Sequence, residues 1–501
     1  MNRRQFLAAI GVVSQRKFLL EGIDPVVCVR YPYLQNVRHD RAAVMWATSA
    51  PGTGWVDYST DNLSPWRRAF AASRTFFPQE TFMPAPFTQY TAFLPRLFPN
   101  TSYTYNVVVD GEPVTTSSRL RTAGAGPFRF LVVGDSGMGT LEQARVASRL
   151  MQEEASFLIH VGDIAYGHGN FPEFQRNYFD YYAGLMQRMP LFTSPGNHEY
   201  DKQHGGAPYF ALHNFPTETV PSSERGRYYS FDWGNVHFVS LDSTSSHPDG
   251  TRIGTLGRVI DGTSDMLNWL QRDLRSTRQF WKVVFFHHPP YAGGQNYGDM
   301  NEREAEKYLP PILEANGVQL VLNGHEHNYQ RTYGLKGGRP VSKDGTGTLY
   351  LTSGGGGAQL YTPTQLPQTA YSNKISHYVR AEVSGTRMVL RAINDSGIEF
   401  DTFTLAPQPV LADINRPIVV DRSSGEQLIK IKGWNLAAQE AFAISNSLAG
   451  TSLTVDGSPM PVIYVSPTQI VGKYNFPFPL TGSHRFVITT VNGILDVSAL
   501  V

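Results

Sequence analysis

The chain has 501 residues, enough for roughly two to four domains of ordinary size. With 43 Lys and Arg against 42 Asp and Glu, its net charge is +1, which excludes binding to a nucleic acid by bulk charge. A single cysteine, Cys28, excludes an internal disulfide and a thiolate zinc cluster, so a bound metal would need oxygen or imidazole ligands.

The N-terminal residues have the pattern of a targeting segment. Arg3 and Arg4 precede an apolar stretch from Ala8 to Val13, and this arrangement resembles a twin-arginine export signal. We therefore expect residues 1–24 to be an export signal and the protein to be periplasmic or secreted, with an ordinary basic N-terminus as the alternative. No later stretch approaches the roughly 18 to 20 apolar residues of a membrane helix, so no membrane span is expected.

Residues 25–122 alternate apolar and polar side chains, as in residues 42–46 and 103–109, and Pro-Gly, Pro-Asn and Asp-Gly turn signals break the runs. This pattern predicts a β-sandwich. The strand around Trp46 and residues 97–105, with a tyrosine at the corner between the sheets, resemble a fibronectin type III domain. Such domains position or bind, so we expect the chemistry to lie elsewhere in the chain.

Residues 127–405 change to short apolar runs separated by helix-like stretches. The runs are residues 130–133, 157–161, 236–241, 283–286 and 318–322. Residues 141–155 place their apolar side chains on one helical face, and Thr140 with Gln143 predicts a capping box at its start. Apolar strands alternating with helices predict a mainly parallel sheet covered on both faces, with ligands gathering beyond the carboxyl ends of the strands.

Residues 408–501 return to a β-like pattern with Pro- and Ser-containing turns, which predicts a third, smaller β-sandwich. Residues 430–436 and 465–470 resemble a bacterial immunoglobulin-like domain of the TIG type. Between the predicted domains, the glycine-rich residues 353–357 are expected to form a flexible loop that can approach a ligand closely.

Five short blocks in the middle region place potential metal ligands just after an apolar run. They are Gly134-Asp135-Ser136-Gly137, Gly162-Asp163-Ile164-Ala165-Tyr166, Gly196-Asn197-His198-Glu199, Val284-Phe285-Phe286-His287 and Gly324-His325-Glu326-His327. One such block is weak evidence, because Gly-Asp is a common turn. Five blocks in succession, each with an oxygen or imidazole donor, predict a single metal centre.

These blocks match the pattern of the metallophosphoesterase superfamily and resemble, within it, the purple acid phosphatases. The distinguishing residue is Tyr166, three positions after Asp163. The resemblance implies a multidomain chain whose α/β catalytic domain is a four-layer sandwich, with helices flanking two β-sheets. That domain would be preceded by a β-sandwich and followed by a small immunoglobulin-like β-sandwich.

The resemblance also implies a dinuclear metal centre in which Asp163 bridges two ions. The first ion would be held by Asp135, Asp163, Tyr166 and His327, and the second by Asp163, Asn197, His287 and His325. Because a phenol ionises at acid pH only beside a strongly acidic cation, the first ion is expected to be Fe³⁺. The second is expected to be Zn²⁺, Fe²⁺ or Mn²⁺.

The implied activity is an acid phosphatase that hydrolyses small-molecule phosphate monoesters by attack of a metal-bound hydroxide. His198 is the expected catalytic acid, and Asn296 and Tyr297 are expected to contact the phosphate. A phosphodiesterase or nucleotide hydrolase on the same centre is the alternative, and a non-catalytic surface-binding protein is a third reading. The oligomeric state stays open.

The remaining titratable residues of this region receive separate interpretations. His160 and His237 lie in apolar runs and are expected to be core residues. His288 follows a ligand in an extended chain and is expected to point away from the metals. His168 and His204 are surface residues that could supply positive charge to the substrate site. The flanking carboxylates Glu199 and Glu326 are hypothesised to orient the ligating imidazoles.

Overall fold

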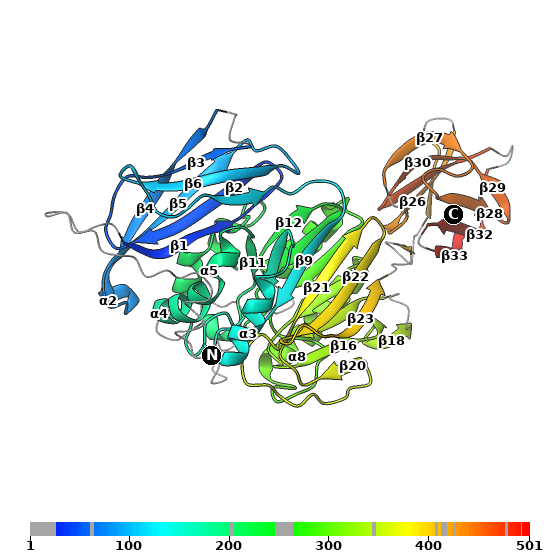
Figure 1. Ribbon diagram of the computed structural model, residues 1–501. Helices are drawn as coiled ribbons and strands as arrows, with labels where there is room; N and C mark the ends of the chain where they lie inside the picture. The colour runs from blue at the N-terminus through cyan, green and yellow to red at the C-terminus, as the bar shows by residue number, and fades with distance from the viewer. Residues whose placement is uncertain are drawn as a thin grey trace, which may run out of the picture.

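The structure is a computed structural model that describes residues 27–60, 65–200, 205–245, 264–342, 347–405, 409–411, 418–423, 426–437, 439–475, 479–491 and 493–501. Residues 1–24, where an export signal is expected, and His204 lie outside these ranges. Figure 1 shows an N-terminal unit in blue, a central unit from cyan through green to yellow, and a C-terminal unit in orange and red. Among the described helices, none is long and apolar enough to cross a membrane.

The N-terminal unit is built from antiparallel strands. These are β1 Cys28–Gln35, β2 Arg41–Thr48, β3 Gly54–Ser59, β4 Arg67–Phe76, β5 Phe87–Pro95, β6 Ser102–Val109, β7 Glu112–Pro113 and β8 Ser118–Arg121, with the short helix α2 Pro78–Thr81 after β4. They are hydrogen-bonded in the order β1-β2-β5-β4-β3-β6-β7, with β8 also on β6. Alternate side chains of β6, among them Tyr103 and Tyr105, are buried, as the period-two pattern predicts.

The first sheet of the central unit has the order β11-β10-β9-β21-β22-β23. Its parallel strands are β9 Phe128–Val133, β10 Phe157–His160 and β11 Leu191–Thr193, and its antiparallel strands are β21 His377–Ser384, β22 Arg387–Asn394 and β23 Glu399–Leu405. Helical segments α3 Leu141–Leu150, α4 Phe171–Glu173, the π-helix η1 Phe174–Phe179 and α5 Asp180–Met186 accompany it. Helix α3 packs against β21 and α5.

The second sheet has the order β12-β13-β14-β15-β19-β16-β20. Its strands are β12 Tyr229–Trp233, β13 Val236–Ser240, β14 Trp281–Phe285, β15 Leu320–Asn323, β16 Tyr329–Thr332, β19 Leu349–Ser353 and β20 Thr369–Asn373. The central four, β13, β14, β15 and β19, are parallel. Helices α7 Asp265–Ser276 and α8 Met300–Ala315 share a buried cluster with this sheet, in which Leu270 and Leu309 meet Val284 and Val321.

Shorter elements complete the central unit: the 3-10 turns η2 Asn197–Glu199 and η3 Ser222–Glu224, helix α6 Ala207–Leu212, and the hairpin β17 Gly334–Lys336 and β18 Arg339–Ser342. The two sheets pack face to face through aromatic rings; Phe130 on β9 meets Phe238 on β13 edge-on at 5.3 Å, and Phe192 stacks on Phe231 at 3.8 Å. The two sheets therefore lie face to face, with helix α3 packed against the first and helices α7 and α8 against the second.

Two details differ from the prediction of a mainly parallel sheet. The α/β region contains two mixed sheets, because the antiparallel strands β21, β22 and β23 extend the first one. The helix predicted over residues 141–155 ends at Leu150. At its start Thr140 accepts a hydrogen bond from the backbone N–H of Gln143, as expected, but the Gln143 side chain accepts from Gly139 instead of closing a capping box.

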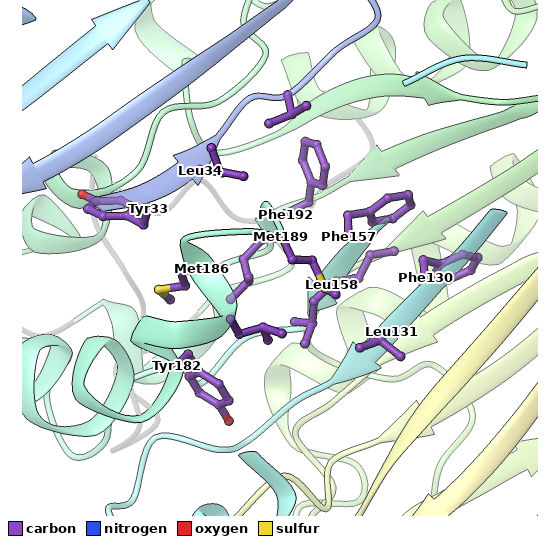
Figure 2. Close-up of a cluster of buried hydrophobic side chains, with 14 of the residues drawn as sticks. Tyr33, Leu34, Phe130, Leu131, Phe157, Leu158, Tyr182, Met186, Met189 and Phe192 are labelled. Carbon is purple, nitrogen blue, oxygen red and sulfur yellow. The ribbon is translucent and has the colours of Figure 1, made fainter. Parts of the chain in front are cut away.

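The N-terminal unit shares its core with the central unit. In Figure 2, Tyr33 and Leu34 from β1 lie beside Met186 and Met189, next to Leu158 on β10. The Tyr33 hydroxyl donates a hydrogen bond to the carbonyl of Leu212 at 2.9 Å. Burial of a continuous apolar surface therefore holds these two units together.

The C-terminal unit has a buried cluster of its own, which includes Ile429, Ile431, Val465 and Phe486. Its strands are β24 Val410–Leu411, β25 Ile418–Asp421, β26 Gln427–Trp434, β27 Ala441–Ser445, β28 Ser452–Val455, β29 Ser458–Met460, β30 Val462–Ser466, β31 Gln469–Tyr474, β32 Ser483–Thr490 and β33 Gly493–Leu500. They form two antiparallel sheets, one around β26 and β31 and one around β28 and β32. Figure 1 shows this unit set apart from the central layers.

Candidate metal centre

All five sequence blocks lie at one edge of the central unit, where parallel strands of both sheets end. The blocks follow β9, β10, β11, β14 and β15. The seven side chains expected to bind metal are at most 7% exposed: Asp135, Asp163, Tyr166, Asn197, His287, His325 and His327. The structure therefore brings together all seven side chains that are expected to bind metal.

The backbone turns sharply where the strands deliver these side chains. Asp135, Asp163 and His325 have φ angles of 57°, 53° and 69°, a left-handed conformation that non-glycine residues seldom adopt. The neighbouring glycines leave room for close approach, since a Cβ on Gly196 would overlap the Asp163 side chain. Strain at these positions is typical of a functional site.

Asp135, Tyr166 and His327 form one side of the centre. The Tyr166 hydroxyl lies 3.1 Å from Asp135 Oδ1 and 2.9 Å from His327 Nε2. Burial and the charges of Asp135 and Asp163 raise the pKa of Tyr166 well above its ordinary value. The phenolate would therefore form here only beside a strongly acidic cation.

Asp163, Asn197 and His287 form the other side. His287 Nε2 is 3.2 Å from Asp163 Oδ2, yet among the described residues it makes no hydrogen bond, and none of them donates to the buried Asn197 Oδ1. Buried polar atoms without partners are costly, and a cation would satisfy both. Burial alone would raise the pKa of Asp163, but the imidazoles of His287, His198 and His325 hold that pKa well below its usual range.

The donors form two groups that could each hold a metal ion, and Asp163 of the first group lies 3.2 Å from His287 of the second. The ligand atoms of Asp135, Asp163 and His327 lie within 4.8 Å of one another, and those of His287, His288 and His325 form a second group of the same size. Hard carboxylate, phenol and amide oxygens, combined with imidazole nitrogens, suit iron, zinc or manganese. The geometry alone does not select among these metals.

Each ligating imidazole is oriented through its second nitrogen. His287 Nδ1 lies 2.8 Å from the carbonyl of Val161, and His327 Nδ1 lies 2.8 Å from the carbonyl of Gln359. His325 differs, because its Nε2 lies 2.9 Å from the carboxylate of Asp299 and its Nδ1 remains for a metal. Such contacts fix the ring and strengthen the donor.

Asp299 was not predicted, and its only sequence signal is that of a helix cap. Its side chain accepts a hydrogen bond from the N–H of Glu302 at the start of α8. Tyr361 was also missed; its ring stacks on His327 at 4.1 Å, while its N–H donates to the His327 carbonyl.

The hypothesis that Glu199 and Glu326 orient imidazoles is wrong in this structure. The Glu199 carboxylate accepts hydrogen bonds from the backbone N–H groups of Asp163, Ile164 and Gly196, so it joins two of the ligand-bearing turns. Glu326 accepts from the N–H of Asn296. Both carboxylates act on the backbone, because the imidazole nitrogens already face carbonyls or Asp299.

His288 is also placed differently from the prediction. It is fully buried, its ring lies 4.5 Å from that of His325, and its Nδ1 lies 2.8 Å from Ser243 Oγ. Neighbouring side chains point to opposite sides only within an extended strand. Strand β14 ends at Phe285, so this rule does not apply to His287 and His288.

The glycine-rich segment is buried behind the centre instead of lining it. The N–H of Gly356 donates to the carbonyl of Gly134, and that of Ala358 to the carbonyl of Asp135. A Cβ on Gly354 would overlap the backbone of Glu326. The glycines thus allow close packing between the blocks, and not the expected approach to a ligand.

The other histidines behave as core residues or lie outside. His160 is buried with Nε2 2.8 Å from Ser136 Oγ, and His237 is held between the carboxylates of Asp232 and Asp273. His168 is exposed and does not line the cavity described below.

His198 is partly exposed beside the ligands. Its ring lies 4.4 Å from that of Tyr166, its Nδ1 is 2.9 Å from the carbonyl of Gly167, and its Nε2 is 4.0 Å from Asp163 Oδ2. A hydrogen bond from Nδ1 to that carbonyl leaves Nε2 facing the centre.

A cavity of about 710 Å³ opens over the centre. Asp163, His198 and His325 line it, together with Asn296 and Tyr297, the two residues expected to contact substrate. Asn296 Nδ2 donates to the carbonyl of His325, while Tyr297 is 57% exposed at the rim.

Comparison with known proteins identifies this region. Residues 128–329 match the calcineurin-like phosphoesterase family. An uncharacterised protein of Mycobacterium tuberculosis is 28% identical over 314 residues, which cover 54% of this chain and 58% of that protein. Purple acid phosphatase 18 of Arabidopsis thaliana is 28% identical over 247 residues, which cover 46% of this chain and 50% of that protein. The chain thus spans little more than half the length of these relatives.

Among solved structures, the purple acid phosphatase isolated from yellow lupin seeds superposes with a TM-score of 0.67 at 19% identity, over 77% of this chain and 75% of that one. This likeness shows that the two proteins share a fold. Together with the family match and the related sequences, it shows that the chain contains a calcineurin-like phosphoesterase domain and has purple acid phosphatases among its relatives.

Proposed function

We propose that this protein is a dimetal phosphatase that hydrolyses phosphate monoesters. The observation that supports it is the convergence of seven buried donors from five strand ends, with Asn197 Oδ1 and His287 Nε2 making no hydrogen bond to any described residue. Two metal ions held here, beside an open cavity, would be suited to phosphate ester hydrolysis.

In this proposal Asp163 would help to hold both ions. Asp135, Tyr166 and His327 would complete the first position, and Asn197, His287 and His325 would complete the second. Fe³⁺ is proposed for the first position, because burial and two carboxylates oppose ionisation of Tyr166 unless the cation is strongly acidic. Zn²⁺, Fe²⁺ or Mn²⁺ is proposed for the second.

When bound, the two ions provide a hydroxide nucleophile and withdraw charge from the phosphoryl oxygens. Hydrolysis consumes one water: its oxygen bonds to phosphorus, the ester P–O bond breaks, and the leaving oxygen takes the electron pair and a proton. His198 supplies that proton from Nε2, since its Nδ1 is already directed at the Gly167 carbonyl. Asn296 and Tyr297 contact the substrate at the cavity wall.

The flanking units and the location are also proposed. A fibronectin type III-like fold for the N-terminal unit is supported by Tyr103, whose hydroxyl accepts a hydrogen bond from the N–H of Phe98 at 2.8 Å, as in a tyrosine corner. The two antiparallel sheets of the C-terminal unit support an immunoglobulin-like domain. Residues 1–24 are proposed as an export signal, which would make the protein periplasmic or secreted.

The test is metal analysis of the purified protein, with a visible spectrum and hydrolysis assays on 4-nitrophenyl phosphate and its bis ester. Two metals per chain, a visible phenolate-to-iron band that Tyr166→Phe abolishes, and faster monoester hydrolysis are expected. Faster turnover of the bis ester would instead assign a phosphodiesterase, and absence of bound metal would remove the proposal.

His198→Ala tests the catalytic step. Because the side chain binds no metal in the proposed centre, and the backbone N–H to Asp163 Oδ1 is retained, metal content and colour should persist. The kcat should fall by about 10² to 10⁴-fold. His168→Ala is the matched control, and an equal loss in that variant would contradict the role of His198.

A further inference from the structure

Two hollows meet at His198. The larger is the cavity of about 710 Å³ over the metal centre, and a second hollow of about 480 Å³ lies beside it. Met138, Tyr166 and His198 line both, so the two form one continuous cleft with His198 at its middle. A leaving group protonated by His198 therefore has two directions in which to extend.

The two hollows differ in the charged side chains that line them. In the larger hollow the described lining includes the carboxylate of Asp299 and the neutral Gln295 and Met300, and it contains neither Lys nor Arg. In the smaller hollow Arg176 is part of the wall. An anionic leaving group would meet no Lys or Arg side chain on the first side and would be attracted by Arg176 on the second.

Arg176 is held in position while its terminal nitrogens stay available. It lies on η1 and is exposed, and its Nε donates to Asn177 Oδ1 at 3.3 Å. Asn177 in turn donates from Nδ2 to the carbonyl of Tyr166 at 3.3 Å. Within the described part of the chain no carboxylate forms an ion pair with Arg176, so its guanidinium fork can receive an anion from a ligand.

We propose that Arg176 binds a carboxylate on the leaving group, so that the preferred substrates are phosphate monoesters of carboxylate-bearing alcohols or phenols. This substrate class rests on the phosphatase function proposed above. The phosphoryl group lies over the metal ligands, the ester oxygen lies beside His198, and the carboxylate lies in the smaller hollow. A planar carboxylate matches the guanidinium through two parallel hydrogen bonds.

The test compares two esters of nearly equal size, 4-carboxyphenyl phosphate and 4-carbamoylphenyl phosphate. The measured quantity is the ratio of their kcat/KM values, charged over neutral. Intrinsic differences in leaving-group reactivity cancel when this ratio is compared between variants of the same protein. Arg176→Gln should lower the ratio by about tenfold, because it removes the charge of an exposed, water-screened pair with the carboxylate.

Two further measurements separate charge recognition from a general structural effect. Arg176→Lys should retain part of the preference, and added salt should reduce the ratio in the parent protein but not in Arg176→Gln. Arg145→Gln is the matched control, because Arg145 is an exposed arginine on α3 that lines neither hollow.

The two proposals fail in different ways. If the carbamoyl ester is hydrolysed and the ratio is the same in the parent, Arg176→Gln and Arg145→Gln proteins, the role of Arg176 is wrong and the phosphatase stands. If the metal-loaded protein hydrolyses neither ester, the phosphatase proposal fails and the substrate class falls with it.

Discussion

The two terminal β units relate to the central unit in different ways. The N-terminal unit contributes Tyr33 and Leu34 to a core that continues to β10, and the Tyr105 hydroxyl donates to the carbonyl of Gln187 at 2.6 Å (Figure 2). The C-terminal unit keeps a separate core, and a hydrogen bond from Gln319 Nε2 to Asn435 Oδ1 reaches it across the boundary.

The difference indicates which unit supports the site. Arg30 on β1 donates to Gln175 Oε1 at 3.1 Å and lies over the ring of Phe179 at 4.4 Å, so it contacts η1 directly. That helix carries Arg176 and Asn177 at the edge of the cleft. The N-terminal unit is therefore part of the scaffold of the catalytic cleft, whereas the C-terminal unit is attached to it.

The largest difference between the two terminal units is expected when each of them is deleted. Truncation after Leu405 should leave a folded, metal-binding protein, because the core of the C-terminal unit is its own. Deletion of residues 27–122 should give insoluble or unfolded protein, because it exposes the shared apolar core. Circular dichroism, calorimetry and metal content of the two truncated proteins provide the comparison. Loss of metal in the C-terminal truncation would contradict it.

Arg30→Ala should be the most damaging single substitution at the N-terminal boundary. Arg30 is 1% exposed, and its removal leaves Gln89 and Gln175 without their buried donor and abolishes the contact with Phe179. The expected loss is about 2 to 4 kcal/mol in the free energy of unfolding, measured in urea. Arg485→Ala is the control in the C-terminal unit, since Arg485 is exposed and its pair with Asp496 faces water.

The seven proposed ligands could be selected from the sequence because the five blocks that contain them each follow a strand of the central unit. Asp163 and His325 could be identified from such local patterns alone. Asp299 and Arg176 could not, because they reach the site through the packing of α8 and η1, and neither has a local pattern beyond that of a helix.

The strands of the central unit also differ in whether a local sequence pattern identifies them. Strands β9, β10 and β14 are buried on both faces and read as apolar runs. Strands β21 and β22 mix buried with partly exposed positions, and Arg380 and Arg391 are paired across them. A search for uninterrupted apolar runs therefore misses both strands. His288 was misplaced for a related reason, because the rule for strands was applied beyond the end of β14.

The stability of the contact between the N-terminal and central units should also depend on pH. His237 faces a cavity lined by Arg38 and Arg41 of the N-terminal unit together with Asp232, Asp273 and Arg278. Burial alone would lower the pKa of His237, but hydrogen bonds to Asp232 and Asp273 raise it from 6.5 to about 9. Its contribution to stability is complete below pH 6.5 and is lost as the pH rises through about 9.

His237→Gln should therefore lower the free energy of unfolding by about 2 kcal/mol at pH 6, with the difference from the parent shrinking by pH 10. His484 is the counterpart in the C-terminal unit, where its Nδ1 lies 2.6 Å from the exposed Asp456. Because water screens that pair, His484→Gln should not change the pH dependence. A constant loss across the pH range in His237→Gln would show that packing, and not ionisation, accounts for its effect.

The smallest expected difference comes from removing one hydrogen bond across each boundary. Tyr105→Phe removes the donor to the carbonyl of Gln187 and should cost about 1 kcal/mol of global stability. Asn435→Gly preserves the left-handed backbone at φ 60° and removes the acceptor for Gln319. Because the C-terminal unit has its own core, this second change should alter only the melting of that unit, leaving the thermal transition of the metal-loaded central unit unchanged. A shift of the central transition by Asn435→Gly as large as that by Tyr105→Phe would mean that both terminal units stabilise the site alike.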